Sequence, residues 1–178
     1  MNFLEGLNSD FVFSTDWPKP IEPEDDDRKW IGSNCMSYAF NYRKPIRSAF
    51  LSSERHDPNI VRDNVFSILG PYDKLQETIP KKEILWRFSY NAGLLGISFR
   101  IEKNAKNIDV SSDEKVIGIA WSRKYGHHFF RRDSDGRWSH KLGWDYEPEI
   151  LCEANENPCE KIKKHGYKVL AILVIKQI

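Results

Sequence analysis

The sequence predicts an α+β domain in which helices come first and an antiparallel sheet follows. Helical spacing and helix stop signals dominate residues 33–93, whereas short runs typical of strands dominate residues 95–175. The chain has 178 residues, which is enough for one domain that folds without disulfide or metal support. We therefore expect residues 31–178 to form a single domain.

Residues 1–30 differ in composition from the rest of the chain. Pro18, Pro20 and Pro23 are followed by four acidic residues at positions 24–27. Proline opposes regular helices and sheets, and an acidic run is usually solvated. We expect an extended acidic and proline-rich arm over residues 1–30.

Three helices are expected before the sheet. Ser33 or Asn34 can cap a helix that begins near Cys35 and ends before Pro45. A second helix is expected over residues 59–69, and a third runs from Pro80 to about residue 91.

The second half of the chain changes to strand patterns. Strands are expected over residues 95–101, 116–121, 127–132, 137–142 and 167–175. Residues 143–157 are rich in acidic residues and are expected to form a loop. A short helix is expected from Pro158, ending at Gly166.

Composition excludes several classes of protein. The 27 basic and 26 acidic residues give a net charge of +1, which argues against a general nucleic-acid binder. The longest apolar run, residues 169–175, is too short to span a membrane. Three cysteines do not form a disulfide framework, and no cofactor is expected. The basic pairs, Arg131-Arg132 among them, are expected on solvated faces.

The first residues do not resemble a secretory signal peptide, since they have no basic segment and no apolar run. We expect a protein that is cytoplasmic as made, or that leaves by a route without a removable signal.

Cys35 is the first candidate for chemistry. At the start of a helix, free backbone N–H groups and the helix dipole stabilise a thiolate and lower the cysteine pKa. The alternative interpretation is a small buried apolar residue.

A predicted β-hairpin supplies the second candidate. If Ser134-Asp135-Gly136 is a type I turn with Gly136 left-handed, Asp133 pairs with Arg137, and His128 and His140 point to one side. A two-residue loop would place them on opposite sides. Two imidazoles on one face suit a relay in which His128 takes the Cys35 proton and His140 orients His128. The alternative is ordinary hairpin residues.

A metal site is the competing chemical interpretation, with His127, His128, His140 and the cysteines as possible ligands. The sequence has no Cys-x-x-Cys and no His-x-x-x-His, which are usual zinc-ligand spacings. No metal is therefore expected.

Two segments resemble known families. The Asn34-Cys35 helix start resembles that of papain-like cysteine peptidases, and residues 126–141 resemble a little-studied bacterial branch of toxin- or effector-associated domains. The spacing of twelve residues between His128 and His140 is similar to that of NlpC-type peptidases. The resemblance implies a papain-like fold, in which N-terminal helices pack on a C-terminal sheet. It implies Cys35 as nucleophile, His128 as base and His140 as orienting residue.

Several assignments stay open. His127 replaces His128 if the strand register slips by one residue. Asp133 or Asp145 could stand in for His140, although strand alternation puts Asp133 on the other face from His128. Asn34 is a candidate helix cap near the oxyanion site, and the Cys35 amide is one oxyanion donor.

The expected function is a cysteine peptidase or amidase that works through a thioacyl intermediate, in the manner of a bacterial effector or toxin. Its substrate would be a protein, a peptide or a peptidoglycan amide. The alternatives are a deamidase or transglutaminase-type acyl-transfer enzyme and a non-catalytic protein-binding module. No nucleic-acid partner and no membrane span are expected.

Overall fold

A computed structural model describes residues 35–41, 81–94, 97–143 and 146–177. The helices are α2 (Cys35–Ala39), α4 (Lys81–Leu94) and α5 (Pro158–Lys164). The strands are β1 (Ile97–Glu102), β2 (Glu114–Ser122), β3 (Gly126–Arg132), β4 (Trp138–Lys141), β5 (Pro148–Cys152) and β6 (Lys168–Gln177). The expected arm over residues 1–30 and the expected helix over residues 59–69 lie outside the described residues.

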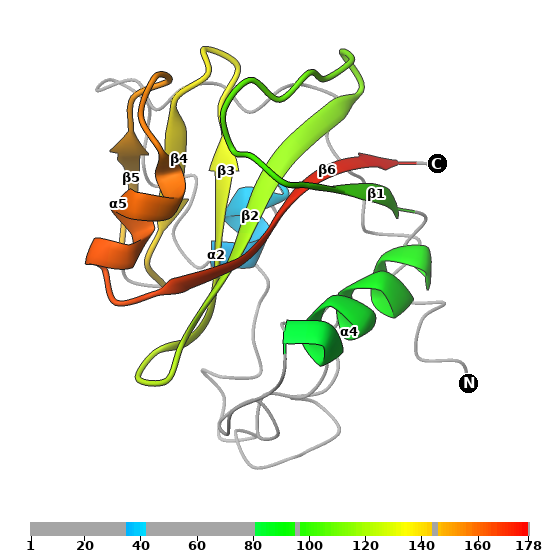
Figure 1. The fold of residues 1–178 in the computed structure, drawn as a ribbon, viewed down its shortest axis with the longest axis horizontal. Coiled ribbons are helices and arrows are strands. Elements are labelled where there is room, and N and C mark those ends of the chain that lie inside the picture. The colour runs from blue at the N-terminus through cyan, green and yellow to red at the C-terminus, as the bar shows by residue number, and fades with distance from the viewer. Residues whose placement is uncertain (1–34, 42–80, 95–96, 144–145, 178) are drawn as a thin grey trace.

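The strands form one six-stranded sheet in the order β1-β6-β2-β3-β4-β5 (Figure 1). Every neighbouring pair is antiparallel. β6 and β2 lie inside the sheet and carry long apolar runs, so both of their faces are buried. The expected buried strand near the C-terminus is therefore confirmed.

Two apolar clusters cover the two faces of the sheet. One contains Met36 and Phe40 from the segment around α2, and Phe88 from α4, packed with Phe129. The other contains Ile162 from α5, together with side chains of β4, β5 and the segment between β1 and β2. We call the two sides the α2 face and the α5 face. In Figure 1, α2 lies behind the sheet and α5 lies in front of it.

The predicted architecture, papain-like with N-terminal helices packed on a C-terminal sheet, is wrong. The described residues are mainly an antiparallel sheet, and α2 has only five residues. It ends early because Asn41 adopts a left-handed conformation, with φ 56°. A helix from late in the chain, α5, covers the other face of the sheet.

The expectation of a loop over residues 143–157 is also wrong, because β5 forms there. Leu151 and Cys152 are buried in the α5-face cluster, while Glu149 beside them is exposed. The acidic residues on either side of this short strand hid it in the sequence. The other strands and the helices at Cys35, at residue 81 and at Pro158 lie within a few residues of their expected positions. Of the helices in the described ranges, none is long and apolar enough to cross a membrane.

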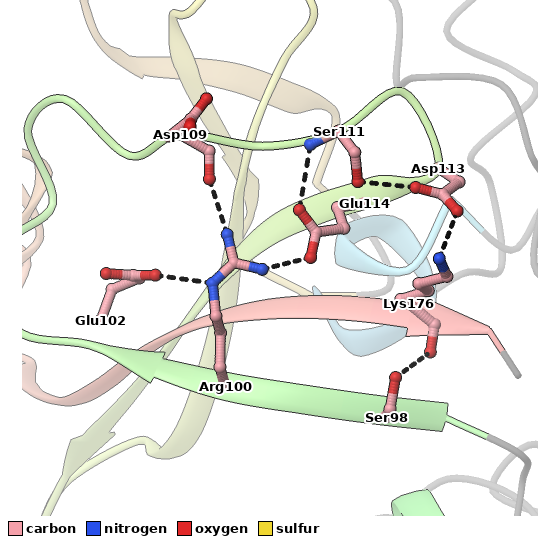
Figure 2. A network of polar contacts seen from close by, with 8 residues as sticks. All are labelled: Ser98, Arg100, Glu102, Asp109, Ser111, Asp113, Glu114 and Lys176. Carbon is pink, nitrogen blue, oxygen red and sulfur yellow. Dashed lines mark hydrogen bonds and ion pairs between the residues drawn. The ribbon is translucent and has the colours of Figure 1, made fainter.

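A polar network joins the β1 edge of the sheet to the segment that follows it (Figure 2). The Arg100 guanidinium donates to the backbone oxygen of Asp109 at 2.6 Å and pairs with the carboxylates of Glu102 and Glu114. Its side chain is largely exposed, so each ion pair contributes little to stability. The network orders the path of the chain between β1 and β2.

At Gly118, the backbone of β2 comes very close to an aromatic side chain of the neighbouring strand. Gly118 pairs with Phe130 of β3, and a Cβ at Gly118 would lie 2.0 Å from the Phe130 ring. Phe130 is fully buried, so the ring has no room to move away. Glycine at this position therefore leaves the space that the Phe130 ring occupies against β2.

We expect Gly118→Ala to lower the free energy of unfolding by about 1–3 kcal/mol, because the added methyl group overpacks the core. Urea denaturation measures the change. Gly143→Ala is the matched control, since its Cβ would meet only Tyr146 at an ordinary 3.6 Å. Equal stability of both variants would contradict the packing described for Gly118.

Candidate functional site

The β3–β4 hairpin has the predicted turn. The Asp133 N–H donates to the Arg137 carbonyl at 2.8 Å, and the Gly136 N–H donates to the Asp133 carbonyl at 3.0 Å. Gly136 has a φ of +88°, the left-handed conformation expected of it. The register pairs Phe130 with His140, as a three-residue loop requires. The predicted hairpin register is confirmed.

This register brings His128 and His140 together on the α5 face. The Nε2 atom of His128 lies 2.9 Å from the Nδ1 atom of His140, within hydrogen-bond distance. Both rings are buried, and the ring of Tyr167 packs on His128 with a centroid distance of 4.8 Å. The prediction that the two histidines share a face is confirmed.

Burial keeps both imidazoles neutral at pH 7. It lowers the pKa of His128 well below its usual value, and the neighbouring His140 adds to this effect. Burial also lowers the pKa of His140 to about 4, with a smaller contribution from His165. Each neutral ring carries one N–H, so the bond between them is a donor–acceptor pair whose direction fixes both tautomers.

Cys35 is the first residue of α2 and packs against the cluster on the α2 face. Burial raises the pKa of the Cys35 thiol to about 11, although the backbone amides of Phe129, Met36 and Cys35 itself and the charge of Lys141 oppose the rise. The expected lowering of the cysteine pKa is therefore wrong. A helix of five residues stabilises the thiolate less than the apolar surroundings disfavour it.

The structure does not join Cys35 to the histidine pair. Successive strand residues point to opposite faces, so His128 projects to the α5 face while Phe129 projects to the α2 face beside Cys35. Among the described residues, no hydrogen bond connects Cys35 with His128 or His140. The expected relay from Cys35 through His128 would have to pass through the sheet.

His127, the alternative to His128, lies on the same face as Cys35. Its ring packs edge-on against Phe129 with a centroid distance of 5.9 Å. Burial lowers the pKa of His127 to about 4. The strand register of β3 is the predicted one. His127 lies on the same face as Cys35 because α2 packs against that face of β3.

A buried clamp fixes α2 on the sheet. The Arg131 guanidinium donates to Asp133 at 2.8 Å, to the backbone oxygen of Tyr38 at 3.0 Å and to the Asn41 side chain at 3.3 Å. It also stacks on the Tyr38 ring at 3.9 Å, and the Tyr38 hydroxyl donates to Ser139 at 2.8 Å. Arg131 is 3% exposed, so the expectation that it lies on a solvated face is wrong.

Asp133 belongs to this clamp and not to the histidine pair. Its carboxylate binds Arg131 on the α2 face, which confirms that it lies on the other side of the sheet from His128. Burial raises the pKa of Asp133 to about 6, and Arg131 limits the rise. Asn34 and Asp145, the remaining candidates, lie outside the described residues.

Two residues that the sequence did not single out lie beside His140. The Oε1 atom of Glu149 is 3.0 Å from the Nε2 atom of His140, and the ring of His165 lies 5.0 Å from the His140 ring. Glu149 comes from β5, which pairs it with His140, and His165 caps the C-terminus of α5. These side chains offer the nitrogen and oxygen atoms that metal ions bind. Sequence spacing alone gave no signal for this group.

Comparison with protein families, curated proteins and solved structures finds no match for this chain. The papain-like and NlpC-type resemblance therefore stays a hypothesis that depends on the residues of the two segments.

The buried histidines predict a loss of stability in acid. Between pH 6.5 and 4 the unfolded chain takes up protons at His127, His128 and His140 that the folded chain does not, so the free energy of unfolding falls as the pH falls. Asp133 acts in the opposite sense, because its folded carboxyl takes up a proton near pH 6. Three groups outweigh one, and each pKa unit corresponds to about 1.4 kcal/mol.

We expect urea denaturation to give a free energy of unfolding several kcal/mol lower at pH 4.5 than at pH 7. His127→Phe removes one of the three groups and should reduce the dependence. A stability that is constant across this range would contradict the burial of the three rings.

Proposed function

We propose that the protein is a cysteine-dependent acyl hydrolase of the peptidase or amidase type, with Cys35 as the nucleophile and His127 as the general base. The observation that carries the proposal is the position of Cys35, which packs against the face of β3 that also presents His127.

The polar groups around the Cys35 sulfur support chemistry there. The amides of Cys35, Met36 and Phe129 and the charge of Lys141 all favour the thiolate over the thiol. Such donors also suit the negative charge that develops on a carbonyl oxygen under attack. Cys35 as a whole residue is partly exposed, while burial of its sulfur raises the pKa of the thiol.

The proposed reaction needs no group beyond the chain and water. The Cys35 sulfur attacks the carbonyl carbon of an amide as its proton passes to His127, forming a carbon–sulfur bond. The carbon–nitrogen bond then breaks, and His127 returns the proton to the leaving amine. Water, activated by the same imidazole, cleaves the thioester, releasing the acid and restoring the thiol.

The high thiol pKa gives this mechanism a distinct signature. A thiol with a pKa of about 11 is almost wholly protonated at neutral pH, so its reactivity depends on a neighbouring base. The imidazole of His127 is neutral at pH 7, the state in which it can act as a base, although burial makes it a weaker base than an exposed histidine. The proposed substrates are amides of proteins, peptides or peptidoglycan.

We expect His127→Ala to slow the labelling of Cys35 by iodoacetamide at pH 7 by about tenfold or more, since general bases contribute about 10²–10⁴-fold to such steps. His128→Ala removes the neighbouring imidazole on the other face and is the matched control. Mass spectrometry after proteolysis quantifies the adduct, with Cys159 as an internal reference.

The reverse result, with labelling lost only in His128→Ala, would overturn His127 as the base and support the relay through His128 and His140. Labelling unaffected by either change would overturn the enzyme proposal and favour a binding module. We further expect Cys35→Ser to abolish cleavage of peptide or peptidoglycan fragments while its circular dichroism stays unchanged. Cleavage retained by this variant would contradict the role of Cys35.

A further inference from the structure

The α5 face carries a second group of reactive side chains, formed by His140, Glu149 and His165. Each offers one atom that can bind a metal ion, and these three atoms lie within 4.8 Å of one another. They come from β4, from β5 and from the end of α5. We call these three residues the α5-face triad.

The unpaired Nε2 atom of His140 indicates that a ligand binds at this position. The His140 side chain is fully buried, and its Nε2 atom has no hydrogen-bond partner. Glu149 lies at ion-pair distance, 3.0 Å, but outside hydrogen-bond geometry. A buried nitrogen without a hydrogen-bond partner lowers stability. Two ligand atoms of one tetrahedral zinc ion lie about 3.4 Å apart when each bond is about 2.1 Å, so atoms as close as these can share an ion.

His128 contacts His140 on the side of the ring that faces away from the α5-face triad. It lies 2.9 Å from the Nδ1 atom of His140, which is the ring nitrogen that faces away from the triad. If the Nδ1–H donates to His128, the lone pair of Nε2 points toward Glu149. Metal-binding histidines usually donate their second nitrogen in this way, which fixes both tautomer and ring orientation. Tyr167 holds His128 in place.

We propose that His140, Glu149 and His165 bind a divalent transition-metal ion of the zinc type, with a position left for water or a ligand from solution. Two imidazoles and one carboxylate form a donor set common to such ions. Glu149 and His165 are exposed, which gives the ion an entry path from solvent. The site lies on the opposite face from Cys35 and does not rest on the proposed cysteine chemistry.

A bound ion would join α5 to two strands, β4 and β5, that already pair with each other in the sheet. It would tie the C-terminal end of α5 to β4 and β5 at the edge of the sheet. Because the unfolded chain does not hold these three residues together, binding would stabilise the folded protein.

Calorimetric titration of the full chain with ZnCl₂, after treatment with a chelator and its removal, tests the proposal. We expect one zinc ion per chain. Glu149→Gln and His165→Ala, both at exposed positions, should each weaken binding at least tenfold. His128→Phe should weaken binding about 10–100-fold, as substitutions of residues that hydrogen-bond to a metal ligand usually do.

Three control variants distinguish other sites. Glu147→Gln changes a nearby exposed carboxylate, His127→Ala changes the imidazole on the other face, and Cys159→Ser removes a thiol in the first turn of α5. Each should bind zinc as the unaltered chain does. Zinc should also raise the melting temperature of the unaltered chain but not of Glu149→Gln. No stoichiometric binding, or binding lost in Cys159→Ser and kept in Glu149→Gln, would overturn the proposal.

Discussion

The register of the β3–β4 hairpin determines which side chains can act together. The turn closed by Asp133 and Gly136 pairs Phe130 with His140, and every assignment of a residue to a face follows from this pairing. A shift of one residue would exchange the two faces of β3. With this register, His128 and His140 meet on the α5 face, while His127 lies on the α2 face with Cys35.

The position of Cys35 depends on the hairpin in a second way. Arg131 and Ser139 face each other across β3 and β4, and both bind Tyr38 of α2. A helix of five residues is not stable by itself, so tertiary contacts must hold it. Breaking a buried ion pair such as that of Arg131 and Asp133 is costly, because it leaves an uncompensated charge in the core. The clamp thus fixes the place of the cysteine.

Local patterns predicted much of the fold. The turn chemistry around Gly136 fixed the hairpin, and the apolar run near the C-terminus identified the inner strand β6. The sequence did not show which face of the sheet α2 would cover, since either face of β3 offers aromatic side chains and a histidine. That choice depends on contacts between residues far apart in the sequence, as between Tyr38 and Ser139, which are 101 positions apart. For the same reason the meeting of His140, Glu149 and His165 could not be predicted, because it requires the pairing of β5, a strand hidden among acidic residues.

The two proposed sites lie on opposite faces of the sheet in this arrangement. A crystal structure tests the separation most directly through the distance from the Cys35 sulfur to the ring nitrogens of His127 and His128. We predict that the sulfur lies closer to His127, with the sheet between it and the His128 ring. A sulfur within about 4 Å of a His128 ring nitrogen, the range of a loose hydrogen bond to sulfur, would contradict the separation and restore the relay across both histidines.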